Sequence, residues 1–259
     1  MAFADLDNVR IHYELTGKAG LPVLVLSNSL GVNLSMWKPQ VEAFSAHSQV
    51  LRYDTRGHGQ SSVPRGPYAI DDLGGDVLGL LDTLEIKRAS FCGLSMGGST
   101  GQWLGIHAAD RIDKLILANT AAKIGEAEIW NVRIAVALSE GLETIIPGTL
   151  ERWFTPEFRA ANPEVVANTK AMLEATNVQG YAACSAAIRD SDFRATLSAI
   201  TIPTLVISGR HDPVTPPENG RTLAAAIPGA LYVELEAAHL SNLEALTEFN
   251  AAVTTFLAN

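Results

Sequence analysis

The sequence GLSMG at residues 93–97 is the feature that most constrains the fold of this 259-residue chain. It lies between an apolar run at 89–92, which predicts a strand, and residues 96–107, which are typical of a helix. A G-x-S-x-G sequence at such a junction forms a sharp turn, because side chains at either glycine would collide with the neighbouring strand and helix. The turn exposes Ser95 beside the helix N-terminus, whose amides favour negative charge. The pentapeptide therefore predicts a nucleophilic serine.

A serine nucleophile needs a base, and the base needs an acid that orients it. His239 is the candidate base, because it follows an apolar run at 231–235 and precedes a helix-like segment at about 242–257. Asp212 is the candidate acid, because it follows the β-branched run at 204–207. Catalytic groups of open α/β sheets gather at the carboxyl ends of the strands. Both residues are therefore expected at the same edge of the sheet as the serine.

The other candidates for acid and base fit less well. A further predicted strand at 115–118 ends in Asn119, which cannot carry the negative charge of the acid. His211, beside the candidate acid, is expected to make packing or hydrogen-bonding contacts. His58 belongs to the sequence DTRGHGQS at 54–61, which is rich in turn formers. We expect that stretch to be a structural loop near the serine.

A second loop is expected to face the serine. The sequence SNSLG at 27–31 follows a predicted strand at 23–26. In hydrolases with this kind of turn, such a loop donates one amide to the oxyanion of the tetrahedral intermediate, and the residue after the nucleophile donates the other. We therefore predict that the N–H groups of Leu30 and Met96 form an oxyanion hole. Loss of one such donor raises the barrier by roughly 3 to 4 kcal/mol.

Strands and helices alternate along most of the chain, which predicts an α/β fold with a mostly parallel sheet and helices on both faces. Between about 121 and 195 the pattern is instead helical throughout. The expected helices there span 126–140, 142–154, 163–176 and 181–189. A helical block after the sixth strand is typical of a cap that excludes water and selects substrates. We therefore divide the chain into a core of residues 1–120 and 196–259 and a cap of residues 121–195; extra packing helices are the alternative.

Composition excludes several function classes. A formal net charge of −9 argues against a nucleic-acid partner, which normally requires a basic patch. Two distant cysteines, Cys92 and Cys184, form neither a disulfide framework nor a zinc site, and we expect both to be buried. No secretory signal and no apolar run long enough for a bilayer is visible. These observations predict a cytoplasmic protein that does not bind a membrane.

The whole chain resembles the α/β-hydrolase superfamily, in which the triad runs in the order Ser, Asp, His. More narrowly, it resembles the 3-oxoadipate enol-lactonases of the β-ketoadipate pathway for aromatic-compound catabolism. The narrower likeness is carried by LSNSLG at 26–31, LSMW at 34–37, LRYDTRGHG at 51–59, FCGLSMGG at 91–98 and ERWFT at 151–155. Many hydrolases have His-Gly after the third strand, whereas this chain resembles the enol-lactonases in having Asn28-Ser29 there.

The resemblance implies an α/β-hydrolase fold with an eight-stranded sheet and a cap inserted after strand 6. It also implies hydrolysis of 3-oxoadipate enol-lactone to 3-oxoadipate through an acyl-enzyme. Ser95 would attack the lactone carbonyl, His239 would take its proton, and Asp212 would hold the imidazole. Neither a metal nor an organic cofactor is needed for these steps.

The substrate implied by the resemblance is a small anionic lactone, which needs local positive charge in a chain of net charge −9. Trp130 and Arg133 are three residues apart on an expected helix and therefore share a face. An arginine pairs well with a carboxylate, and a tryptophan supplies an apolar wall. We predict that these two residues, together with Trp153, bind the substrate. The alternative cations are Arg152, Arg189 and Lys123, and each of these charges could instead be solvated surface.

Two further functions remain open on the sequence. A general carboxylesterase or perhydrolase would use the same triad, and fold and motif do not exclude it. A ligand-binding receptor that kept the triad would show slow or single turnover. A dehalogenase or epoxide hydrolase is disfavoured, because those enzymes resemble this fold but have Asp where Ser95 stands.

Overall fold

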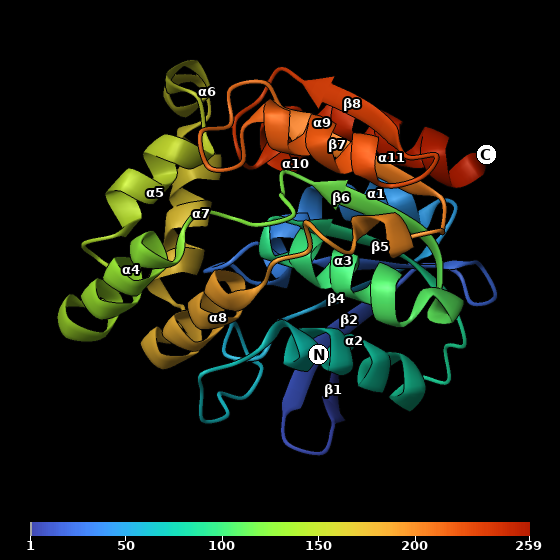
Figure 1. Ribbon diagram of the computed structural model, residues 1–259, viewed down its shortest axis with the longest axis horizontal. Coiled ribbons are helices and arrows are strands. Elements are labelled where there is room, and N and C mark those ends of the chain that lie inside the picture. Colours follow the sequence, from blue (N-terminus) through green and yellow to red (C-terminus); the bar gives the residue numbers. More distant parts are fainter. Residues whose placement is uncertain (1) are drawn as a thin grey trace.

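The computed structural model describes residues 2–259, whose strands form one eight-stranded sheet in the order β1-β2-β4-β3-β5-β6-β7-β8 (Figure 1). The pairs β1–β2 and β2–β4 are antiparallel, and every other neighbouring pair is parallel. The strands are β1 (Ala2–Asp5), β2 (Arg10–Thr16), β3 (Val23–Ser27), β4 (Gln49–Tyr53), β5 (Ala89–Leu94), β6 (Ile112–Ala118), β7 (Thr204–Gly209) and β8 (Leu231–Leu235). The expected sheet, mostly parallel and eight-stranded, is confirmed.

Helices cover both faces of this sheet, as expected for a parallel sheet whose strands are buried on both sides. On one face lie α1 (Lys38–Ser45) and α11 (Leu246–Ala258), which pack against each other. On the other face lie α2 (Ile70–Thr83), α3 (Met96–His107) and α9 (Pro217–Ala226), nearer the viewer in Figure 1. The short helix α10 (Ser241–Glu244) directly precedes α11.

A helical insertion, residues 121–195, separates β6 from β7. Its helices are α4 (Ala127–Glu140), α5 (Ile146–Trp153), α6 (Pro156–Ala161), α7 (Pro163–Glu174) and α8 (Val178–Asp190). They gather at the left of Figure 1, where the chain leaves the carboxyl end of β6. Within the insertion, α4 packs against α8 and α5 packs against α7. Among residues 2–259, no helix has both the length and the hydrophobicity that crossing a bilayer requires.

Several element boundaries differ from the pattern-based expectation. The helix expected over 142–154 begins only at Ile146. Pro147 lacks an amide hydrogen and is accommodated only in the first turn of a helix, so the preceding residues form turns instead. The segment at 242–257 is interrupted at Ala245, whose ψ of 53° is not helical. The short elements β1, α6 and α9 were not expected at all, because few residues carry their periodicity.

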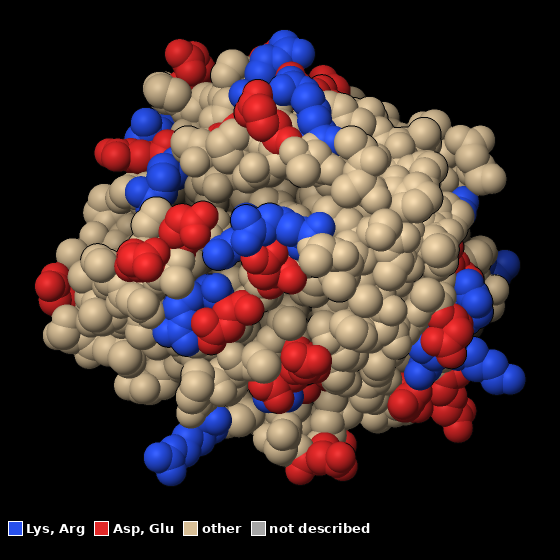
Figure 2. Space-filling view, viewed as in Figure 1, with Lys and Arg blue, Asp and Glu red and all other residues tan. Residues whose placement is uncertain are grey.

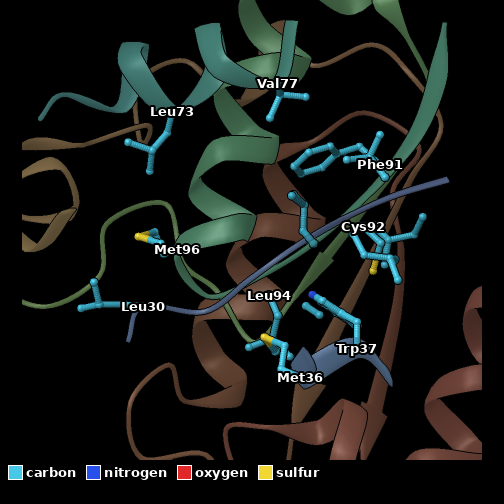
Figure 3. Close-up of a cluster of buried hydrophobic side chains, with 14 of the residues drawn as sticks. Leu30, Met36, Trp37, Leu73, Val77, Phe91, Cys92, Leu94 and Met96 are labelled. Atoms are coloured by element: carbon cyan, nitrogen blue, oxygen red, sulfur yellow. The ribbon is translucent and has the colours of Figure 1, made fainter. Parts of the chain in front are cut away.

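The core includes β5 and β7, in which every residue is buried. Successive side chains of a strand point to opposite faces, so Phe91 and Cys92 pack into different layers (Figure 3). Leu73 and Val77 of α2 lie in the layer that Phe91 enters. Full burial of one such large apolar side chain stabilises the fold by roughly 1.5 to 3 kcal/mol. This packing fixes the strand that carries the serine.

The order of the strands creates a topological switch point between β3 and β5. From β3 the chain passes to β4 on one side and later returns to β5 on the other side of β3. Open α/β sheets bind ligands outside the carboxyl ends of the strands at such a switch point. Residues 27–31 after β3 and Ser95 after β5 meet there.

Gly93 offers a stability test of the turn after β5. A Cβ atom at Gly93 would lie 2.0 Å from the carbonyl oxygen of Gly97, which is backbone and cannot move aside cheaply. We expect Gly93→Ala to destabilise the protein by about 3 kcal/mol in urea unfolding, as an overpacked core site does. Gly75→Ala is the matched control: its Cβ would meet nothing within 4 Å on helix α2, so the variant should gain about 0.5 to 1 kcal/mol. Equal stabilities for the two variants would contradict the crowding seen at the turn.

Candidate active site

Ser95 occupies the sharp turn between β5 and α3 with a φ of 58° and a ψ of −112°. Positive φ is rare for a residue with a side chain and costs roughly 1 to 3 kcal/mol, so the surroundings must hold it. The Ser95 amide donates to the carbonyl of Ala118 at 2.9 Å, and the Thr120 hydroxyl donates to the Ser95 carbonyl at 2.9 Å. The sequence predicted an exposed serine, but only 6% of Ser95 is accessible, because the helical insertion packs over this end of the sheet.

Asp212 and His239 meet across the ends of β7 and β8, as predicted. His239 Nδ1 lies 2.8 Å from Asp212 Oδ2, and the two side chains are almost fully buried. With Nδ1 occupied, Nε2 is the ring nitrogen left to exchange a proton with a reacting group. The hydrogen bonds described for residues 2–259 do not extend from His239 to Ser95 Oγ, and such bonds commonly tighten only when substrate binds.

The Asp212 carboxylate is held by several donors besides His239. The amides of Val214 and Thr215 donate to Oδ1 at 2.8 and 3.1 Å, and the Thr215 hydroxyl donates to Oδ2 at 2.7 Å. Burial favours the neutral acid, but His239 and the hydrogen bonds outweigh it and lower the pKa of Asp212. Asp212 is therefore ionised at neutral pH, as an orienting acid must be.

Asn119 has a role that the sequence did not reveal. Its Nδ2 donates to Asp212 Oδ2 at 3.1 Å and to the carbonyl of Ala238 at 3.1 Å, while its Oδ1 accepts from the Ser241 hydroxyl at 2.5 Å. Asn119 thus ties the loop that carries the acid to the loop that carries His239. On the sequence it stood only as a rejected acid, although an amide side chain at a strand end is itself a signal of loop bracing.

The loop after β3 is fastened to the serine turn. The Gly97 amide donates to the carbonyl of Asn28 at 3.0 Å, and Asn28 Nδ2 donates to the carbonyl of Tyr53 at 2.8 Å. These bonds hold the loop that contains Leu30 next to the turn that contains Met96. Neither the Leu30 amide nor the Met96 amide is used in the hydrogen bonds described for residues 2–259. Both predicted oxyanion donors are therefore without a partner among these hydrogen bonds.

His58 and His211 are the two other histidines that the sequence places near the candidate site. His58 is buried, accepts a hydrogen bond from the Gly31 amide at 2.9 Å, and has Nδ1 3.3 Å from the carbonyl of Arg56. Burial lowers the pKa of His58 to about 4. His211 is exposed and lies 2.9 Å from Glu236, away from the buried pair. The structure thus places the His58 ring beside the loop that contains Leu30 and Gly31, and His211 at the surface.

The two predicted tryptophans line different parts of the insertion. Trp130 on α4 is mostly buried, and its indole N–H donates to the carbonyl of Ile124 at 2.5 Å. Trp153 at the end of α5 is also buried, and its ring centroid lies 6.1 Å from that of His239. Trp153 therefore borders the catalytic candidates directly, whereas the polar edge of Trp130 is already used within the insertion.

Arg133 is held by neutral partners only. Its Nε donates to the Tyr181 hydroxyl, its Nη2 donates to the Thr149 hydroxyl at 3.0 Å, and its guanidinium lies 5.9 Å from the Trp130 ring centroid. Arg152 is three residues after Thr149 on α5 and therefore shares the face of that helix that Arg133 contacts. Burial and the positive charge of Arg133 lower the pKa of Arg152.

Arg133 and Arg152 differ from the other two candidate cations, Lys123 and Arg189, in their salt bridges. Lys123 pairs with Glu126 at 3.3 Å, and Arg189 pairs with Asp190 at 2.7 Å. Among residues 2–259, neither Arg133 nor Arg152 has a carboxylate within the 4.0 Å that defines a salt bridge. Across the same residues, no three His, Cys, Asp or Glu side chains are arranged to hold a metal ion.

The buried His58 makes stability depend on pH. An unfolded histidine takes up a proton near pH 6.5, whereas His58 in the folded protein resists protonation until about pH 4. Stability is therefore full above pH 6.5 and falls as the pH drops from 6.5 towards 4, by about 3 kcal/mol over the whole window. Urea unfolding between pH 4 and 7 measures this loss, and His58→Gln, which cannot titrate, should show a correspondingly smaller one. Parallel pH profiles for the two proteins would contradict the expectation.

Comparison with known proteins agrees with this geometry. Residues 38–239 match the family model described as serine aminopeptidase, S33. The chain is 48% identical over 246 residues to 3-oxoadipate enol-lactonase 2 of Acinetobacter baylyi, covering 95% of this chain and 92% of the relative. It is 41% identical to 3-oxoadipate enol-lactonase 1 of the same organism, covering 91% and 88%. The crystal structure of the enol-lactonase from Burkholderia xenovorans LB400 matches over 100% of both chains, with a TM-score of 0.98 and 48% identity. The chain therefore belongs to the α/β-hydrolase family, and within it is similar to the 3-oxoadipate enol-lactonases.

Proposed function

We propose that this protein hydrolyses 3-oxoadipate enol-lactone to 3-oxoadipate, in the β-ketoadipate pathway. The observation that carries the proposal is the buried Asp212–His239 pair. It lies at the same edge of the sheet as Ser95, whose backbone is strained, and as the amides of Leu30 and Met96. That constellation supports acyl transfer from an ester. The identity to enol-lactonases over nearly the whole chain supports this particular lactone.

In the first half of the proposed reaction, Ser95 Oγ attacks the lactone carbonyl carbon while its proton passes to His239 Nε2. The carbonyl oxygen becomes an oxyanion and accepts hydrogen bonds from the amides of Leu30 and Met96. Preorganised donors of this kind stabilise the transition state, because they need no reorganisation as the charge develops. Asp212 stays ionised and stabilises the imidazolium.

Collapse of the tetrahedral intermediate breaks the ring C–O bond and leaves the acyl group on Ser95. The leaving group is an enolate, so it leaves more readily than an alkoxide. It takes the proton from His239, either on oxygen to give an enol that then tautomerises to the ketone, or on carbon to give the ketone directly, and His239 is neutral again. In the second half, His239 takes a proton from water, and the resulting nucleophile attacks the acyl carbon. Return of the proton to Ser95 releases the carboxylic acid.

We propose that Arg133, with Arg152 beside it, binds the carboxylate of the substrate. Basic and acidic side chains are interspersed on the face shown in Figure 2, and the net charge is −9, so the overall field does not attract an anion. Two adjacent arginines without a carboxylate partner repel each other, and a bound carboxylate relieves that repulsion. Trp153, beside His239, supplies an apolar wall on the other side of the lactone.

We further propose that residues 121–195 act as a cap over a core of residues 1–120 and 196–259. Contacts from the insertion reach both loops of the site: Trp153 lies beside His239, and the Thr176 hydroxyl donates to the carbonyl of Gly31 at 2.8 Å. Only 6% of Ser95 and 1% of His239 are accessible, which supports exclusion of water during the reaction.

The proposed function predicts rapid loss of the enol-lactone absorbance with the purified protein. Ser95→Ala should lower kcat by at least about 10⁴-fold, because the nucleophile is lost while binding is retained. Thermal unfolding of the variant should match that of the wild type. Turnover of neutral aryl esters without turnover of the lactone would point instead to a general carboxylesterase. A stable complex after a single turnover would point to a receptor.

Arg133→Met tests the proposed carboxylate site. The variant loses a charge-assisted contact worth roughly 1.5 to 3 kcal/mol, so the KM for the lactone should rise about 10- to 100-fold. The KM for neutral p-nitrophenyl acetate should stay the same, because that ester has no carboxylate. Arg189→Met is the control, since Arg189 is already paired with Asp190 at 2.7 Å, and both KM values should stay at wild-type level. An unchanged KM for the lactone in Arg133→Met would rule out Arg133 as the binding residue.

A further inference from the structure

We propose that His58 is a positioning residue for the oxyanion hole, acting by accepting the Gly31 amide and so fixing the peptide that follows Leu30. The assignment rests on the proposed function, because only an acyl-transfer enzyme needs the Leu30 amide aimed at an oxyanion. His58 touches neither Ser95 nor His239 in the hydrogen bonds described for residues 2–259. Its effect on the reaction would therefore pass through the loop.

The loop depends on such an anchor because Gly31 has no side chain with which to pack. Its φ of +84° lies in the left-handed region, and a Cβ there would sit 2.7 Å from Leu173 Cδ2 and 3.2 Å from Tyr181 Cε2. The positive φ therefore favours glycine, and any larger residue would also make the Leu173 side chain shift. A glycine also has the greatest backbone freedom of any residue, so hydrogen bonds must supply the order that a side chain would give.

Both polar groups of Gly31 are in fact bonded, and to different parts of the molecule. The amide donates to His58 Nε2 at 2.9 Å, in the loop after β4. The carbonyl accepts from the Thr176 hydroxyl at 2.8 Å, in the insertion. The peptide planes on either side of Gly31 are therefore fixed from two directions. Because the plane before Gly31 begins at Leu30, the His58 bond limits how the Leu30 backbone can turn.

The surroundings of His58 suit an acceptor. Nε2 accepts only if the ring is neutral with its proton on Nδ1, which faces the carbonyl of Arg56 at 3.3 Å. The Cys184 sulfur from α8 lies 3.8 Å from Nδ1 and carries no charge, because burial raises its pKa far above neutrality. Asp54, in the same loop, is the acid whose charge reaches the ring, and burial outweighs it. The ring thus keeps the tautomer that holds Gly31.

A purely structural histidine would affect stability without affecting the chemical step, and the two roles differ in their kinetics. His58→Met keeps the length of the side chain but removes the strong acceptor. It should lower kcat for p-nitrophenyl acetate about 10- to 100-fold with little change in KM, as partial loss of an oxyanion donor does. His58→Gln can place an amide oxygen near the position of Nε2 and should restore kcat to within about 3-fold of wild type.

Asp76→Asn provides a matched control in the same region. Asp76 forms a buried ion pair with Arg56, at 2.6 Å, so this variant lowers stability but keeps both groups of the His58–Gly31 hydrogen bond. We expect a lower Tm with kcat unchanged. If Asp76→Asn lowers kcat as much as His58→Met at an equal loss of Tm, the proposal is wrong. It is also wrong if His58→Gln folds normally but does not recover kcat.

The rate at which a fluorophosphonate labels Ser95 separates this proposal from the choice of substrate. Phosphonylation also develops charge on an oxygen in the oxyanion hole, so it should slow in His58→Met and recover in His58→Gln. If the wild type is labelled and cleaves the neutral ester but not the enol-lactone, the substrate assignment fails. The labelling and ester-cleavage rates of the His58 variants then decide the role of His58. If the wild type is neither labelled nor active on any ester, the proposed function fails and the role of His58 fails with it.

Discussion

Ser95 keeps a backbone conformation that a residue with a side chain rarely adopts, and it does so because three neighbouring strands meet around it. Its amide is bonded to the end of β6, and the next turn of chain is bonded through Gly97 to the loop after β3. A side chain at Gly93 would collide with the backbone of Gly97, and one at Gly97 would collide with the backbone of Ser27. The strain is thus balanced by contacts at the carboxyl ends of the strands.

The electrostatics of the site follow from how each buried group is solvated by the protein. Asp212 loses its water on burial, yet amides, hydroxyls and His239 supply enough hydrogen bonds to keep it ionised. For His58, burial outweighs the carbonyl of Arg56 and the charge of Asp54, so the lowered pKa keeps the ring neutral. Asp212 and His58 are both buried, but they have different partners. Asp212 is therefore ionised beside His239, whereas His58 is neutral. Triad chemistry requires the first arrangement, and an amide acceptor requires the second.

The insertion is joined to the chemistry by a continuous set of contacts. Arg133 is bonded to the Tyr181 hydroxyl, and the Tyr181 ring packs on Gly31, next to the proposed oxyanion donor. On the other side of the site, Glu244 is bonded to both Thr155 and the amide of Ala238, beside His239. Residues proposed to bind the substrate and residues proposed to react with it therefore share neighbours. A change at these shared neighbours, Tyr181 and Glu244, is expected to affect kcat as well as KM for this reason.

The sequence by itself determined the class of fold, the serine turn and the two loops that supply Asp212 and His239. These follow from local signals, because glycine spacing, apolar periodicity and the position of a residue after a strand depend on short stretches of chain. Helix boundaries were less secure where a single residue such as Pro147 or Ala245 set the limit.

Only the tertiary structure decided how distant side chains pair. Asn119 and Asp212 are 93 residues apart, Arg133 and Tyr181 are 48 apart, and Gly31 and His58 are 27 apart. Such contacts depend on strand order, on the packing of the insertion and on the rotamers of buried groups, none of which a local pattern encodes. The arginines show the same limit of local patterns: Arg152 and Arg189 each have an acidic neighbour in the sequence, Glu151 and Asp190, but only Arg189 forms a salt bridge with its neighbour in the fold.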